Sequence, residues 1–250
     1  MGKNKISLKK LIIMIMIFAL GLSSSVYASI PNKLPEDHKV INGQLYINGN
    51  KVTEIIQVES GITKELTIDQ YILELEYGEI SFDDTITLED TSEDLGNSPL
   101  GITDDWYRYD ETSNITVLRT DKRERVSTVL KNETSNPADH ILSTTCVSGH
   151  SFSFNVGTGE RPYIQTGAGF TWESSLSRTE EKKLTINSGM YGWWEFAPQE
   201  NKTVGLFKTF SWLGELKDFK QVHAYSPKKV NNKFLDGVYY ALESSKMPTN

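Results

Sequence analysis

The side chains best suited to nucleophilic, acid–base or metal chemistry are one cysteine and four histidines. They are Cys146, His38, His140, His150 and His223. Cys146 and His150 are four residues apart, which in a strand puts them on one face but ~13 Å apart. That distance is too long for a shared metal ion or proton. A complete set of zinc ligands does not occur at a zinc-binding spacing, and a cysteine nucleophile would need a third, orienting group that cannot be assigned.

Other catalytic patterns are missing from the sequence. It contains neither a Gly-x-Ser-x-Gly elbow nor a phosphate-binding loop. The carboxylate pairs Asp83-Asp84 and Glu89-Asp90 would face opposite sides of a strand, so they fit solvated turns, with weak calcium binding as the alternative. We therefore expect no enzymatic activity, no cofactor and no metal. A net charge of −7 offers no basic surplus, so we expect no nucleic acid partner.

Two stretches alternate between apolar and small polar residues, as an amphipathic strand does. The first is HSFSFNV, residues 150–156, and the second is TGAGFTWESSLSRT, residues 166–179. Their apolar faces contain Phe152, Phe154, Val156, Ala168, Phe170, Trp172 and Leu176. Because GTGERP, residues 157–162, predicts a turn between them, we expect the two stretches to form a hairpin.

Two interpretations of this hairpin remain open. In the first, its apolar face packs in the core of a soluble sandwich and its hydroxyl face meets water. In the second, hairpins from several copies join into a membrane barrel with the apolar face toward lipid. Strands of ~9–11 residues are long enough to cross a bilayer in that way.

The region around the first stretch resembles the aerolysin-type β-pore-forming proteins. That family has an Asn followed by Thr or Ser at a strand end, then alternating strands rich in Ser and Thr that contain the insertion hairpin. The segment KNETSNPADHILSTTCVSGHSFSF, residues 131–154, supplies Asn132 and Thr134 and leads into the two alternating stretches. The resemblance covers about residues 125–190. It implies a protein that forms homo-oligomers on membranes through that hairpin.

A second aromatic group lies in GMYGWWEF, residues 189–196. Trp193 and Trp194 are adjacent, so in a strand they face opposite sides. We expect at least one of them in the core. An exposed partner could anchor at a lipid interface or stack on a sugar ring, so the pair is a candidate aromatic binding surface.

The first 28 residues predict a secretory signal peptide. Lysines precede an apolar run from Leu11 to Leu22, and small residues end at Ala28. The run is shorter than the ~20 residues of a spanning helix, which makes a retained anchor the weaker alternative. We therefore expect a protein secreted to the extracellular space. Its single cysteine excludes an internal disulfide and suits a bacterial exported protein.

Charge divides the remaining chain. Residues 30–105 contain 17 acidic and 4 basic residues, a net charge of −13. We expect an acidic N-terminal region or pro-segment over residues 29–103, followed by a β-rich main domain over residues 104–250. The stretch Thr91–Gly101, rich in turn formers, is the predicted linker.

Short alternating runs separated by turn residues predict an all-β, mostly antiparallel fold. The architecture would be a sandwich or an elongated β domain with the small acidic region in front. In the leading region, the Asn-Gly steps at 42–43 and 48–49 predict tight hairpins. Thr67–Gly78 fits a short helix with a capping box or an alternating strand, and we favour the helix. Later strands are expected at Ile115–Arg119, Arg125–Asn132, His140–Val156, Thr166–Thr179, Leu184–Asn187, Gly192–Phe196, Thr203–Trp212, Phe219–Tyr225 and Gly237–Glu243.

Together these features predict a secreted, membrane-active, toxin-like protein with membrane lipid as its partner. Removal of residues 29 to about 100 would activate it. The alternative is a secreted, non-catalytic binding module that recognises a glycan or cell-envelope polymer through Trp193 and Trp194. An extracellular enzyme ranks third among the hypotheses, because no set of catalytic residues can be named.

Overall fold

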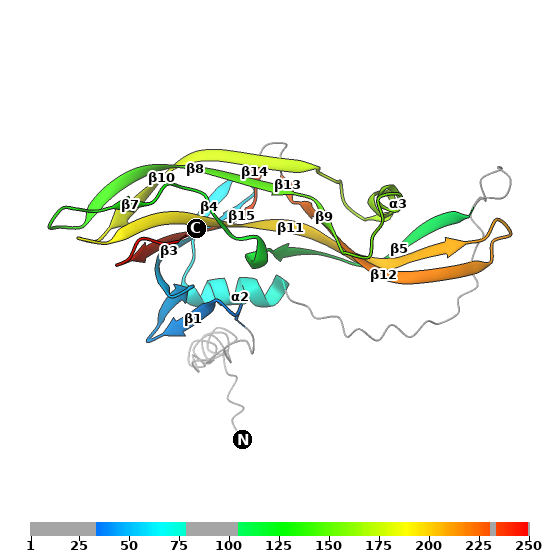
Figure 1. Ribbon diagram of the computed structural model, residues 1–250, viewed down its shortest axis with the longest axis horizontal. Coiled ribbons are helices and arrows are strands. Elements are labelled where there is room, and N and C mark those ends of the chain that lie inside the picture. The colour runs from blue at the N-terminus through cyan, green and yellow to red at the C-terminus, as the bar shows by residue number, and fades with distance from the viewer. Residues whose placement is uncertain (1–33, 79–104, 231–233, 250) are drawn as a thin grey trace, which may run out of the picture. The chain divides into compact units, whose positions relative to one another are not determined.

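The computed structural model describes residues 34–78, 105–230 and 234–249, which belong to one compact unit (Figure 1). These residues form mainly antiparallel strands, which confirms the predicted all-β fold. The predicted signal peptide, the carboxylate pairs Asp83-Asp84 and Glu89-Asp90, and the predicted linker lie outside the described residues. Within the described ranges, no helix is both long and apolar enough to cross a membrane.

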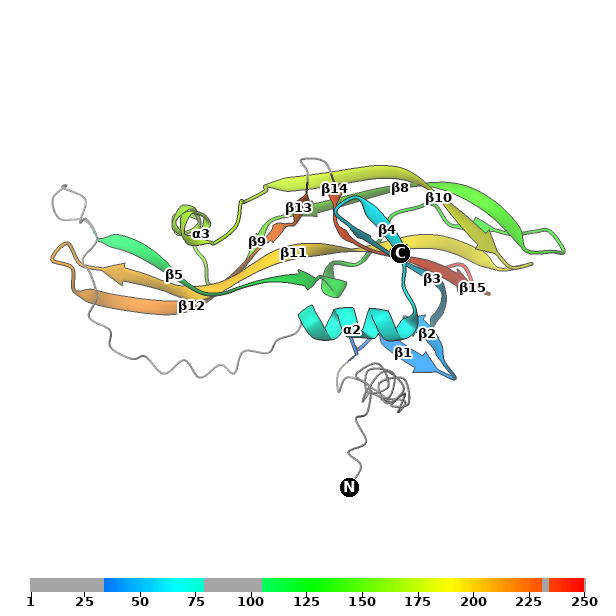
Figure 2. The ribbon, with the colours of Figure 1, turned by 180° about the vertical axis from the view of Figure 1, so that it is seen from behind.

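Strand β11, Tyr191–Phe210, is 20 residues long and lies at the centre of the main sheet (Figure 2). Its first part, as far as Pro198, pairs with β15, Gly237–Ser244, and its second part pairs with β5, Trp106–Leu118, and β12, Leu216–Pro227. Pro198 has no N–H to donate, and it occupies the point where the partner changes. One strand therefore joins two differently paired halves of the sheet.

Two short strands pair with β11, and two others, β13 (Lys229–Val230) and β14 (Phe234–Leu235), form a small sheet of their own. Where a single strand was predicted at Arg125–Asn132, the structure has two short ones that both pair with β11, so that prediction was wrong in extent. The other short elements of this part are η1 (Thr120–Lys122), β6 (Glu124–Arg125) and β7 (Leu130–Lys131).

The leading region is built into the main sheet. Its strands are β1 (His38–Ile41), β2 (Gln44–Ile47), β3 (Asn50–Glu59) and β4 (Ile62–Glu65). Asn42-Gly43 and Asn48-Gly49 both have positive φ angles in the turns between these strands, which confirms the predicted Asn-Gly hairpins. β3 pairs with β15 from Lys51 opposite Glu243 to Val58 opposite Gly237.

Helix α2, Ile68–Gly78, confirms the helical interpretation of that stretch. Its predicted capping box is present: the Gln70 N–H donates to the Thr67 hydroxyl at 3.2 Å, and the Thr67 N–H donates to the Gln70 side chain at 3.1 Å. The helix buries Tyr71 among residues of the leading strands and β15.

Trp193 and Trp194 face opposite sides of β11, but their exposed fractions are 1% and 0%. Trp193 packs with Tyr71 and Tyr240 on one side, and Trp194 packs with Tyr239 on the other. Neither indole is therefore exposed as an aromatic binding surface in this structure. Both indoles are buried because other elements pack on both faces of β11 at this point. The sequence pattern shows only that the two indoles face opposite sides.

A chain of buried hydrogen bonds fixes the leading region to the sheet. The Tyr240 hydroxyl donates to Tyr71 at 3.1 Å, and the Tyr71 hydroxyl lies 2.8 Å from Nε2 of His38. On its other side, Nδ1 of His38 lies 2.7 Å from Oδ1 of Asp37. Arg123 donates to the other oxygen of this carboxylate, Oδ2, at 2.5 Å. If His38 is neutral with its proton on Nδ1, each hydrogen bond in this chain has one donor and one acceptor: Nδ1 donates to Asp37, and Nε2 accepts from Tyr71. A second proton would turn Nε2 into a donor and displace the Tyr71 hydrogen.

This chain predicts a pH dependence of stability. Burial lowers the pKa of His38 below its ordinary value of 6.5, against the opposing effect of Asp37. The unfolded chain therefore binds this proton more readily, so acidification below about pH 6.5 destabilises the fold. The free energy of unfolding should fall more steeply between pH 7 and pH 5 in the natural protein than in His38→Gln. Urea denaturation at each pH measures both slopes, and parallel slopes would contradict the prediction. Asp37, whose pKa is lowered from 3.8, titrates outside this window.

Candidate functional site

Two strands form a small sheet of their own on one face of the main sheet (Figures 1 and 2). They are β8, Ala138–Gly149, and β10, Ser175–Ile186, and we call them the cover pair. Their antiparallel register runs without a shift from Ile186 opposite Ala138 to Ser175 opposite Gly149. Because the cover pair lies outside the main ladder, mostly side chains attach it to the protein.

One end of the cover pair is held by apolar packing. Leu142, Leu184 and Ile186 are buried against a cluster on the main sheet that contains Trp194 and Tyr239. Apolar burial of this kind stabilises by roughly 1.5–3 kcal/mol per large side chain. This end is therefore the firmer attachment.

The Asn132–Thr134 pair, which carries part of the family resemblance, anchors the same end. The Asn132 amide donates to the carbonyl oxygens of Ile186 and Asn136, each at 2.8 Å. Its side-chain oxygen accepts from the N–H and hydroxyl of Thr134 at 2.9 and 2.7 Å. In this structure Asn132 and Thr134 fix the end of β10 and the turn that precedes β8.

Beyond Leu142, the cover pair meets the sheet through more polar groups, although Leu176 also packs on the apolar cluster. Ser148 is buried, and its hydroxyl donates to Glu200 at 2.8 Å. Lys182 is also buried, with its ammonium 2.9 Å from Glu180 and 3.9 Å from the ring centre of Tyr239. Fewer apolar contacts are lost if this part separates from the sheet.

Glu180 forms the centre of a row of charges on that inner face. Burial alone would raise its pKa, but hydrogen bonds from Lys182 and Arg178 outweigh burial and lower the pKa. Glu180 pairs with both cations within β10, which leaves the three side chains with a net charge of +1. The row can therefore leave the sheet as an intact group of ion pairs.

Cys146 lies between the apolar and polar parts of the inner face and is fully buried. Its thiol donates to the Tyr239 hydroxyl at 3.2 Å, and burial raises the thiol pKa to about 12. The thiolate is the reactive form of cysteine, so this side chain is inert while the cover pair is in place.

The segment between the cover strands, residues 150–174, corrects the predicted hairpin. The first predicted strand breaks after Gly149: β9 contains only Ser151–Phe152 and pairs with β12. The second is replaced over its first residues by helix α3, Arg161–Gly167, and β10 begins only at Ser175. We call residues 150–174 the connecting segment.

Tertiary packing explains the difference from the predicted strands. Val156 and Ile164 are buried against Tyr109, Phe207 and Val222 on the second half of the main sheet. Ile164 reaches this cluster from α3, so the helix gains a contact that two long free strands would lack.

The structure brings three of the seven predicted apolar residues together. Phe152 and Trp172 stack with ring centres 5.3 Å apart, and Phe170 lies 5.3 Å from Trp172. Phe154 is fully exposed to solvent and packs on nothing.

Val156 is buried in the cluster against which Phe152 and Trp172 also pack. The last two predicted residues lie elsewhere: Ala168 follows α3, and Leu176 lies on β10, partly buried against the sheet cluster. The predicted apolar face therefore does not exist as one surface in this structure.

Hydrogen bonds and an ion pair, which we call the latches, also attach the connecting segment to the main sheet. The carboxylate of Glu111 accepts from the Gly169 N–H at 3.1 Å and from the Thr203 hydroxyl at 2.6 Å. The Lys220 ammonium binds Glu160 at 2.8 Å and the Asn155 carbonyl oxygen at 2.6 Å. Such partly exposed ion pairs and hydrogen bonds contribute little each, about 0.2–1 kcal/mol for an exposed pair.

The register of the cover pair, if continued, would pair the apolar residues of the connecting segment with one another. The His150 N–H donates to the Ser174 carbonyl oxygen at 3.3 Å, one pair beyond Gly149 and Ser175. Continued at the same register, the ladder would set Phe152 opposite Trp172, Phe154 opposite Phe170, and Val156 opposite Ala168. Residues directly opposite in an antiparallel pair share a face. The six side chains would thus form one continuous apolar stripe.

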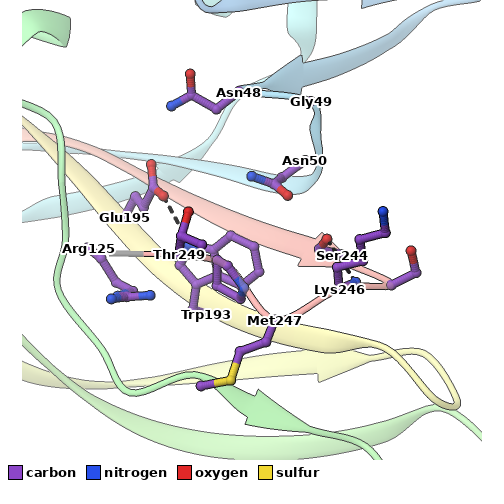
Figure 3. A pocket seen from close by; sticks show the side chains of 12 residues that line it. Asn48, Gly49, Asn50, Arg125, Trp193, Glu195, Ser244, Lys246, Met247 and Thr249 are labelled. Atoms are coloured by element: carbon purple, nitrogen blue, oxygen red, sulfur yellow. Dashed lines mark hydrogen bonds between the residues drawn. The ribbon is translucent and has the colours of Figure 1, made fainter.

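A pocket of about 880 Å³ lies on another part of the same unit (Figure 3). It is lined by the turn after β2, by β6, by the start of β11 and by residues that follow β15. Trp193 and Glu195 form one wall, where the indole N–H donates to the Glu195 carboxylate at 3.0 Å. Sequence reasoning missed this pocket because its walls are far apart in the chain.

No group of three or more metal-binding side chains that could hold an ion occurs among the described residues. Comparison of the chain with protein-family models, curated proteins and solved structures finds no match.

The buried thiol gives a direct check of the cover pair. At pH 8, Cys146 in the folded protein should react with a disulfide reagent at least a hundredfold more slowly than a free thiol, because its pKa is about 12. In denaturing urea the single thiol should react at the ordinary rate. Absorbance of the released thiolate follows both reactions, and fast reaction of the native protein would contradict the described packing.

Proposed function

We propose that this is a secreted, membrane-active protein in which the cover pair and connecting segment refold into one long hairpin. Hairpins from several copies would line a membrane barrel, in keeping with the resemblance to aerolysin-type pore formers. The continuous register carries the proposal, because it would align six apolar side chains of the connecting segment on one face.

The length of the extended hairpin fits a bilayer. Residues 148–157 and 167–176 would supply two strands of about ten residues each, within the ~9–11 residues that a membrane strand needs. Arg178, Glu180 and Lys182 follow on the same face. Because charged side chains are costly on the lipid face, this row would mark where the hairpin leaves the hydrocarbon.

The energetic balance also supports refolding. Refolding would break the pairing of β9 with β12, the burial of Val156 and Ile164, and the contacts of Glu111 and Lys220. It would gain burial of Phe154, which is now fully exposed, and fuller burial of the partly exposed aromatic side chains. Each large apolar side chain transferred from water is worth roughly 1.5–3 kcal/mol.

The leading region needs a different role from the one first expected. Since β3 pairs with β15 along most of its length, a cut between residues 79 and 104 would leave the leading strands bound to the sheet. Proteolysis alone would therefore not remove it. In the proposed mechanism the leading region stays in place as part of the scaffold.

Two substitutions test which face of the proposed hairpin contacts lipid. Phe154→Arg should lower the rate of dye release from zwitterionic liposomes at least tenfold, because Arg on the lipid face costs roughly 2–4 kcal/mol near the midplane. Thr171→Arg should retain most of the activity, since the continued register turns Thr171 to the opposite face. Both residues are exposed, so neither change disturbs the soluble fold. Equal losses, or no release by the natural protein, would refute the proposal.

Cys146 reports the movement itself. When liposomes are added, the natural protein should take up a maleimide label at Cys146 at least tenfold faster than in solution, because the cover pair leaves the sheet. A parallel sample with liposomes and Phe154→Arg should label more slowly than the natural protein. Dye release without any increase in labelling would show that membrane activity comes from another part of the chain.

A further inference from the structure

We infer that the pocket beside the turn after β2 binds an acidic sugar, a ring that carries both a carboxylate and hydroxyl groups. This site is separate from the cover pair and connecting segment, and it does not depend on the proposed membrane activity. Its volume of about 880 Å³ lies within the ~300–1,000 Å³ of small-molecule sites, which leaves room for a short oligosaccharide.

The charge of the pocket favours an anion. Arg125 and Lys246 both line it, and in Figure 3 they flank Trp193. Within the described part of the chain, neither side chain has a carboxylate partner. The one acid that lines the pocket, Glu195, is already paired with Arg123 at 2.7 Å. Two cations thus remain without a counter-charge in a chain whose net charge is −7.

The polar groups of the pocket favour hydroxyls in addition to an anion. Asn48 and Asn50 line it from the tight turn, and each amide offers a donor and an acceptor. Hydroxyl groups on a sugar ring donate and accept in the same way. Sulfate has acceptors only, and inorganic phosphate has one or two O–H donors, so either offers the amide oxygens fewer donors than a sugar ring does.

Secondary structure fixes the backbone of part of this site, while Lys246 follows the end of β15. Asn48 and Gly49 have φ angles of 51° and 78°, as a two-residue hairpin turn requires. Arg125 is held by the pairing of β6 with β11, opposite Glu195. A site whose side chains start from fixed strands loses less entropy when it binds.

Isothermal titration calorimetry on residues 29–250 tests the inference with three probes. Trigalacturonate should bind, while maltotriose, which has rings but no carboxylate, should bind at least tenfold more weakly. Tricarballylate, which has three carboxylates but no ring hydroxyls, should also bind at least tenfold more weakly. Equal binding of either control, or no binding of trigalacturonate at millimolar concentration, would overturn the inference.

Variants locate the binding in this pocket. The double variant Arg125→Gln with Lys246→Gln should weaken trigalacturonate binding at least tenfold. The control Lys39→Gln removes an exposed charge outside the pocket and should change affinity less than twofold. An unchanged affinity in the double variant would overturn the assignment. Dye release from sugar-free liposomes should be the same for the double variant and the natural protein, which separates this site from the membrane activity.

Discussion

The described structure depends on the pairing of β11. This strand takes β15 as a partner as far as Pro198 and β5 and β12 beyond it, so it joins both halves of the main sheet. The leading region is attached through β15 and β3, which places it in the same hydrogen-bonded network. Elements in this network can separate only by breaking ladders of backbone hydrogen bonds, which makes the main sheet a rigid scaffold.

The cover pair lies outside that network, whereas the connecting segment joins it through the two residues of β9, which pair with β12. The attachment of both parts is uneven. Apolar contacts fix the end near Ile186, whereas Ser148, Lys182 and a few latches hold the rest. The same segment contains the most exposed aromatic side chain, Phe154. A rigid scaffold with one weakly attached, partly apolar segment is the arrangement that a protein needs if it is to change partner from its own sheet to a membrane.

The sequence predicts local features well. The Asn-Gly turns, the capping box of α2 and the all-β class follow from residue preferences that act over a few positions. The alternation of residues 150–156 and 166–179 is present in the sequence, but the described fold uses these side chains differently. Ile164 draws its neighbours into α3 by packing on a distant strand, and no local pattern encodes that contact.

Cross-linking on membranes tests the central claim, which is that the connecting segment continues the register of the cover pair. In a Cys146→Ser background, cysteines at positions 154 and 170 should oxidise to a disulfide once the protein is bound to liposomes. Cysteines at positions 154 and 171 should not, because the second pair lies on opposite faces of the ladder. Equal cross-linking of the two pairs, or none for 154 and 170 under conditions of dye release, would contradict the account.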